Sequence, residues 1–219
     1  ESMVRAYEML KDSEESLREA GDKVYLVAKQ NLRVAKNAER HYRGMLDPRI
    51  DSWNARADHF FETYDRLIRT HGNDARGIVW AHNTHIGDAR QTAMSLQGQV
   101  NIGQRARERY GADNVFAVGF GTYAGTVIAG ASWEAPMQEM QVPPAPPESI
   151  EGLLQSLELG TFYFIADGDM EPEDFWFRPQ PHRAIGVVYN PMRENPGNYV
   201  PTILPRRYDA FIFIPRTTA

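Results

Sequence analysis

The hydrophobic period of the chain changes once, close to His71-Gly72. Before that point, apolar side chains recur every three or four residues, the spacing that gives a helix one buried face. After it, apolar residues form short runs separated by glycine and proline, which is typical of strands and turns. The change predicts a helical segment over residues 1–72 and a sheet with flanking helices over residues 77–219.

Three helices are expected in the first segment. The first ends near Gly21, because a glycine often follows the last turn of a helix. The second covers residues 22–45, and the third follows Asp51 or Ser52, either of which can cap it. The third helix carries an apolar stripe that we interpret as core packing, made of Trp53, Ala57, Phe60, Phe61, Tyr64, Leu67 and Ile68.

Short apolar runs in the second segment predict six strands. The first, residues 77–82, is an unbroken apolar run, which indicates burial on both faces. Helices are expected within residues 88–110 and 150–157. This alternation predicts an α/β fold, a mostly buried sheet with flanking helices that forms a single domain or the C-terminal part of one. The other strands are expected at residues 114–120, 126–132, 161–166, 184–189 and 208–214.

Glycines at positions 119, 121 and 125 predict a turn between two of these strands. Their spacing has one residue too many for the dinucleotide-binding fingerprint, and the residues that follow have the character of a strand rather than a helix. We therefore expect no bound dinucleotide at this turn.

The composition excludes several classes of protein. The absence of cysteine rules out disulfide scaffolds, cysteine-ligated metals and thiol nucleophiles, and it is typical of a reducing compartment. A net charge of −5 with dispersed basic residues provides no patch for nucleic acid. The N-terminus lacks the apolar core of a signal peptide, so we expect a cytoplasmic protein. Residues 114–133 carry no charge, but their four glycines argue against a membrane span.

Two histidines follow the first expected strand, in the sequence Trp80-Ala81-His82-Asn83-Thr84-His85-Ile86-Gly87-Asp88. In α/β sheets, ligands bind where the chain leaves the carboxyl ends of the strands. An offset of three residues would place both imidazoles on one side of a helical turn. Histidine titrates near neutral pH, so His82 and His85 are candidate bases that activate water, and Asp88 can orient one ring.

Other interpretations of this region stay open. Two histidines at a strand end can cap a helix or satisfy polar groups of the core. A zinc centre would need a third ligand, and the pattern of two histidines four residues apart with an intervening glutamate is absent, so we expect no metal and no cofactor. No Gly-x-Ser-x-Gly motif supports a serine nucleophile. A set of acidic residues lacks the glycine position of a calcium loop and predicts a solvated loop: Asp167, Asp169, Glu171 and Glu173.

The stretch from Gly77 to Arg90 resembles the strand-and-loop signature of the erythromycin esterase family. The resemblance extends from about residue 22 to the end of the chain. It implies an α/β fold and a hydrolase that directs water at an ester, the type case being a macrolide lactone in antibiotic resistance. His82 and His85 match the catalytic histidines. The other matching segments are residues 30–31, 37–43, 52–54, 101–104, 118–127, 135–137 and 208–210.

The chain departs from the family pattern in two places. The family typically has an Arg-Asp pair after the Trp-Asn segment, whereas this chain has Arg56-Ala57, so Arg56 is a supporting candidate without its acidic neighbour. The family also begins with a portion that carries a Gly-Glu-His motif and further glutamates, and no segment here matches it. By resemblance, the chain corresponds to the C-terminal part of such an enzyme, with Asn83 and Asp88 as further supporting residues.

Three functions are consistent with these observations. The first is a hydrolase in which one histidine activates water, the other orients it, and N–H groups of the glycine-rich turn stabilise the oxyanion. The second is a non-catalytic binding module, or an incomplete fragment that needs the N-terminal portion as its partner. The third is a metal-dependent hydrolase. We expect a small-molecule ester or lactone as the substrate, and no nucleic-acid or membrane partner.

Overall fold

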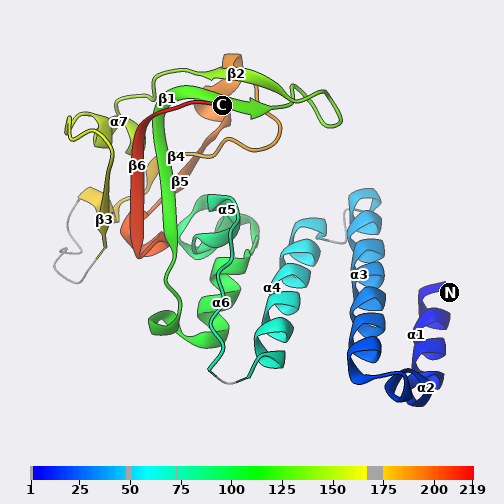
Figure 1. The fold of residues 1–219 in the computed structure, drawn as a ribbon. Helices are drawn as coiled ribbons and strands as arrows, with labels where there is room; N and C mark the ends of the chain where they lie inside the picture. The colour runs from blue at the N-terminus through cyan, green and yellow to red at the C-terminus, as the bar shows by residue number, and fades with distance from the viewer. Residues whose placement is uncertain (1, 48–50, 73, 167–174) are drawn as a thin grey trace. The chain divides into compact units, whose positions relative to one another are not determined.

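A computed structural model describes residues 2–47, 51–72, 74–166 and 175–219 (Figure 1). The chain divides into two compact units, residues 1–75 and 76–219, and the division lies where the hydrophobic period changes. Most of the uncharged stretch 114–133 forms a β-strand. Within the described ranges, every helix is too short or too polar to span a membrane.

Helices make up the first unit: α1 (Ser2–Asp12), α2 (Glu14–Glu19), α3 (Asp22–Leu46) and α4 (Ser52–Thr70). Gly21 precedes α3 with φ 128°, a conformation open to glycine that separates α3 from the helix before it. Asp51 caps α4, since its carboxylate accepts a hydrogen bond from the Asn54 amide at 2.9 Å. The second and third predicted helices are confirmed, whereas the first is divided at Ser13 into α1 and α2.

Polar side chains join α3 to α4. Gln30 of α3 donates to the Thr63 hydroxyl (3.3 Å) and accepts from Nε of Arg66 (3.1 Å). The apolar stripe of α4 is only partly covered, because Ala57 is buried whereas Phe60 and Leu67 are 44% and 54% exposed. The prediction of core packing is therefore confirmed for Ala57 and wrong for these two larger side chains.

The second unit is built on a four-stranded sheet in the order β2-β1-β6-β3 (Figure 1). β1 (Val118–Ala129) and β6 (Ala210–Thr217) are parallel neighbours, with antiparallel β2 (Gln138–Val142) and β3 (Phe162–Ile165) outside them. β4 (Gln180–Arg183) and β5 (Tyr199–Thr202) form a separate antiparallel pair. The α-helices of this unit are α5 (Asn83–Ile86), α6 (Ile102–Tyr110), α7 (Ile150–Gln155), α8 (Glu194–Gly197) and α9 (Leu204–Arg207). Short 3-10 turns lie at Ala89–Gln91, Ala93–Gln97, Ala112–Asn114, Phe175–Phe177 and Pro191–Arg193. The predicted α/β fold is confirmed.

One hydrophobic core joins the sheet of the second unit to its helices. The predicted helix at 150–157 forms as α7, where the Ser149 hydroxyl accepts a hydrogen bond from the Gly152 amide (3.1 Å). The predicted strands at 161–166 and 208–214 form as β3 and β6. Phe162 and Phe164 of β3 pack, partly buried, against a cluster of buried residues that includes side chains of α7 and β6: Ala117, Ile150, Leu154, Leu204, Tyr208, Phe211 and Phe213.

The predicted strand at residues 77–82 does not form (Figure 1). Ile78 and Trp80 are 93% and 87% exposed, and the backbone of residues 78–81 makes no hydrogen bond within the described part of the chain. A strand needs a neighbour to satisfy its backbone, and no described strand lies in register with this segment. The prediction of burial on both faces is wrong here for that reason.

The predicted glycine-rich turn is also wrong, because β1 continues through it as one strand. The glycines serve close packing instead: a Cβ on Gly119 would lie 2.7 Å from the Phe211 ring. At Gly125, where φ is 136°, a Cβ would lie 2.1 Å from the Thr217 carbonyl oxygen of β6. Backbone N–H groups of a turn at residues 119–125 are therefore not available as an oxyanion hole.

Two further expectations need correction. Of residues 88–110, only Ile102–Tyr110 is α-helical, and the preceding stretch forms 3-10 turns. The strand predicted at 184–189 lies earlier in the chain, at Gln180–Arg183. That strand has two fully or nearly buried polar residues, His182 and Arg183, and so lacks the apolar run that identifies a buried strand in a sequence.

A substitution at Gly103 tests how closely α6 packs against α5. A Cβ at this position would lie 1.9 Å from the Ile86 carbonyl oxygen, so α5 must shift in a Gly103→Ala variant. We expect a loss of about 1–3 kcal/mol in the free energy of unfolding, measured by urea denaturation. Gly186→Ala is the matched control, since no atom lies within 4 Å of its Cβ, and it should change stability by less than about 1 kcal/mol. Equal effects of the two substitutions would contradict this packing.

Candidate active site at the His82–His85 turn

His82 caps the short helix α5. Its Nδ1 accepts a hydrogen bond from the Thr84 amide at 3.3 Å, and the Thr84 hydroxyl lies 2.9 Å from the same nitrogen. An N–H can donate only to a ring nitrogen with a free lone pair, so Nδ1 carries no proton and the ring proton is on Nε2. The capping role that the sequence left open is thus present in the structure.

His85 lies in the same turn. Its amide donates to the His82 carbonyl at 2.8 Å, and the residue is half-buried. The two imidazoles are close enough for the charge on one to affect the protonation of the other. The two candidate bases are therefore the N-cap of α5 and a residue within that four-residue helix.

Asn83 fixes this turn to the open edge of β1. Its side-chain amide donates to the Phe120 carbonyl (2.5 Å) and accepts from the Phe120 amide (3.1 Å), which are the bonds that a neighbouring strand would make. The backbone carbonyl of Asn83 accepts from Nη2 of buried Arg207 at 3.2 Å. Asn83 supports the site by positioning the two histidines that flank it.

Asn101 joins the turn to α6. Its side chain is fully buried, caps α6 by accepting from the Gln104 amide (2.9 Å), and donates to the Thr84 carbonyl (2.9 Å). In the sequence, residues 101–104 were of interest only because they resemble the family. In the structure, Asn101 of this segment hydrogen-bonds to the turn. It holds α5 from the side of the next helix.

A buried acid–imidazole pair lies next to the turn and was missed by sequence reasoning. Nδ1 of His182 lies 2.7 Å from Oε1 of Glu151, and both side chains are fully buried. Nε2 of His182 lies 3.5 Å from the side-chain nitrogen of Asn83. Because 31 residues separate the two side chains along the chain, no local sequence motif predicts the pair. Only the packing of α7 against β4 brings it together.

The pKa of His82 is lowered below its usual 6.5. The residue is exposed as a whole, but protein atoms crowd its ring, and this loss of hydration is the main cause because it disfavours the charged form. Nearby His85 lowers the pKa further, and His182 and Arg207 do so to a smaller extent. A hydrogen bond with the backbone of Ile185 acts in the opposite direction. His82 is consequently neutral at pH 7.

Asp88 does not orient either imidazole. This buried carboxylate caps the 3-10 turn that follows it and forms an ion pair with Arg90 (Oδ2–Nη2, 2.7 Å). Nη1 of Arg107 lies 3.8 Å from the same oxygen. Because its negative charge is paired with these two arginines, Asp88 stabilises the segment after the turn and does not contact a histidine ring.

Arg56 belongs to the first unit. Its guanidinium lies 5.3 Å from the Trp53 ring centroid and 5.9 Å from that of Phe60, both on its own helix α4. These are cation–π contacts within one helix.

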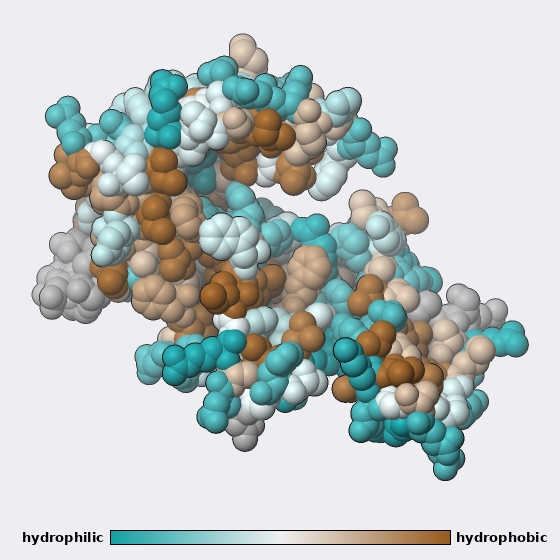
Figure 2. Space-filling view, viewed as in Figure 1, coloured by the Kyte–Doolittle hydropathy of each residue, from teal (hydrophilic) through white to brown (hydrophobic). Residues whose placement is uncertain are grey.

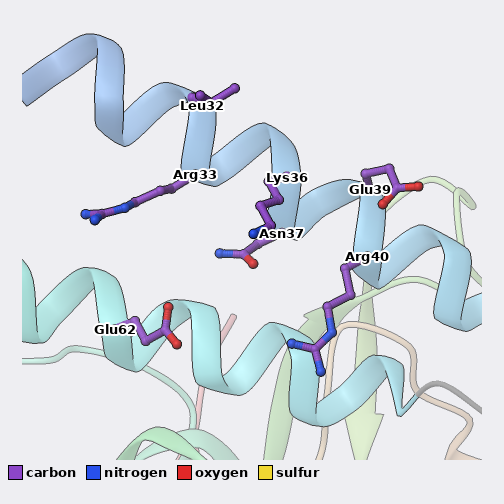
Figure 3. Close-up of a pocket in the computed structure, with 7 residues that line it drawn as sticks. All are labelled: Leu32, Arg33, Lys36, Asn37, Glu39, Arg40 and Glu62. Carbon is purple, nitrogen blue, oxygen red and sulfur yellow. The ribbon is translucent and has the colours of Figure 1, made fainter. Parts of the chain in front are cut away.

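A surface groove of 530 Å³ lies between α3 and α4 in the first unit (Figure 3). Arg40 reaches from α3 toward α4, which contributes Glu62 (Figure 3). Three cationic and two acidic side chains line the groove, so its charges are largely balanced. Its lining contains Leu32, Arg33, Lys36, Asn37, Glu39, Arg40 and Glu62, three of which belong to the matching segment 37–43.

Among the described residues, no group of three or more histidine, aspartate or glutamate side chains is arranged to hold a metal ion. The acidic residues that the sequence assigns to a solvated loop, Asp167, Asp169, Glu171 and Glu173, lie outside the described residues.

Three solved structures share this fold. A protein from Bacillus cereus has 16% sequence identity and a TM-score of 0.78, over 99% of this chain and 52% of its own. A succinoglycan biosynthesis protein has 19% identity and a TM-score of 0.68, over 99% of this chain and 51% of its own. A mutant of the erythromycin esterase EreC, in its open conformation, has 17% identity and a TM-score of 0.67, over 98% and 51%.

The chain thus spans about half the length of the structures that it matches. A sequence model of the family described as erythromycin esterase matches residues 1–217, which is nearly the whole chain. The match includes the helices of the first unit as well as the histidine turn and the sheet of the second. The chain belongs to the erythromycin esterase family.

Proposed function

We propose that this chain is part of a carboxylic ester hydrolase in which a histidine of the α5 turn activates water. The observation that carries the proposal is the pair His82 and His85 on one turn, in a member of the erythromycin esterase family. A base must be neutral to take a proton, and the lowered pKa of His82 shows that this environment favours neutral imidazole. The proposed substrate is a small-molecule ester or macrolide lactone, encountered in the cytoplasm.

We propose different roles for the two histidines. Nδ1 of His82 accepts a hydrogen bond from the Thr84 amide and caps α5, so this histidine holds the turn. We propose His85 as the base, which removes a proton from water as the water oxygen attacks the ester carbonyl. His82 holds the turn and supplies a neutral N–H dipole beside it. The proton on His85 then passes to the departing alkoxide, which leaves as an alcohol.

A second candidate function is an incomplete part of such an enzyme, inactive by itself. This is favoured by the observation that the chain spans only about half of each solved structure that it matches. Under this alternative the 219-residue chain binds a partner but shows no turnover, and activity appears when the remaining half is present. A metal-dependent hydrolase would instead lose activity on dialysis against EDTA and recover it with added metal.

Hydrolysis assays with aryl esters and with a macrolide test the proposed roles. We expect His85→Ala to lower kcat/KM by about 100-fold or more, because general-base catalysis contributes on this scale. His82→Ala should have a smaller effect, since the base is retained. His71→Ala is the matched control: this exposed histidine caps α4 in the other unit, and its loss should leave the rate unchanged. Equal activity of all four proteins would contradict the proposal.

The titration of His82 provides a test that does not depend on turnover. Its ring protons, followed by NMR, should titrate with a midpoint below 6.5, and a His85→Asn substitution should raise this midpoint because it removes a neighbouring positive charge. The His82 ring therefore stays neutral to lower pH than a free histidine does. A midpoint at or above 6.5, unmoved by His85→Asn, would contradict the described environment.

A further inference from the structure

The segment before the histidine turn presents unpaired backbone and large apolar side chains to solvent. Ile78 and Trp80 are 93% and 87% exposed, and residues 77–82 carry no charge. Within the described ranges, the backbone N–H and C=O groups of residues 78–81 have no hydrogen-bond partner. Exposed apolar residues are common one at a time, but here they coincide with a run of free backbone groups.

This segment ends beside an incompletely covered edge of the sheet. β6 pairs with one edge of β1 from Val118 onward, whereas β2 covers the other edge only over residues 125–129. At Phe120 the place of a strand is taken by the Asn83 side chain. The Trp80 ring meets the Phe120 ring edge-on, with centroids 6.0 Å apart.

Further exposed apolar side chains lie in and just before β1. Phe116, which precedes β1, and Phe120, which lies in the part of β1 that β2 does not cover, are 65% and 38% exposed. Trp80, whose ring meets that of Phe120, thus joins exposed apolar surface of the segment 77–82 to that of β1. Figure 2 shows apolar surface in the middle of the second unit, over the stretch that Figure 1 draws in front of α6. Natural proteins usually cover or charge such an edge, because it is a template for pairing with another strand.

We propose that residues 77–82 are the docking site for a β-strand from the other half of the enzyme, the half that the matched structures contain and this chain does not span. The occupant is inferred from length: the chain aligns over 98–99% of itself but only 51–52% of each match. A docked strand pairs with the backbone of residues 78–81 and covers Ile78 and Trp80. Main-chain hydrogen bonds supply affinity in this mode, and the two side chains supply specificity.

Hydrogen–deuterium exchange of the full product of the encoding gene, compared with the 219-residue chain, tests the inference. We expect the amides of residues 78–81 to exchange freely in the 219-residue chain and about 100-fold more slowly in the longer product. A gene product of only 219 residues, or a longer one in which these amides still exchange freely, would overturn it. Protection in the 219-residue chain that grows with its concentration would overturn it in favour of a second copy. The readout does not depend on turnover, so its failure is distinguishable from failure of the proposed hydrolysis.

A Trp80→Lys substitution gives the matched test in the longer product. It should restore fast exchange at residues 78–81 and lower the melting temperature, because a charge replaces a side chain that the docked strand covers. Leu96→Lys is the control, since Leu96 is equally exposed, at 87%, and lies in a 3-10 turn rather than at a sheet edge. In the 219-residue chain neither substitution should change the melting temperature. The inference fails when both variants behave alike in the longer product.

Discussion

The side-chain amide of Asn83 takes the place of a neighbouring strand at Phe120, and the position of the candidate site depends on this contact. Its two hydrogen bonds satisfy the N–H and C=O groups of Phe120 at an uncovered sheet edge. On its other side the Asn83 carbonyl accepts from Arg207, which is fully buried. His82 is the N-cap of the same short helix and His85 lies within it, so both imidazoles are placed relative to the sheet through Asn83.

Burial of charged and polar groups around the turn explains its electrostatics. A buried imidazole or carboxylate without a partner would cost several kcal/mol, and the 2.7 Å contact between His182 and Glu151 offsets much of this cost. Arg207 adds a fixed positive charge close to the turn. Together with crowding of the ring, these neighbours disfavour protonation of His82. The same environment suits a reaction that begins with a neutral base.

Local signals in the sequence predicted the helices of the first unit, α7, β3, β6 and the position of the histidine turn. Those elements are set by periodicity, a cap or a short apolar run, which are properties of neighbouring residues. The segment 77–82 has the pattern of a buried strand, yet no described strand pairs with it, so its pattern alone did not predict its exposure. Glycines 119, 121 and 125 were interpreted as a turn because their packing against Tyr208, Phe211 and Thr217 depends on β6, about ninety residues later. For the same reason, His182 and Glu151 could not be found from spacing.

The amide exchange rate of Phe120, measured by NMR in the wild-type chain and in an Asn83→Ala variant, tests most directly whether Asn83 holds the turn to β1. Our account predicts slow exchange in the wild type and an increase of about tenfold or more in the variant, since a lost hydrogen bond of about 1.4 kcal/mol corresponds to that factor. Asn114→Ala, which removes an exposed side-chain bond to the Tyr110 carbonyl, should leave the rate unchanged. An equal exchange rate of the Phe120 amide in the wild type and in Asn83→Ala would contradict the role of Asn83 in holding the turn to β1.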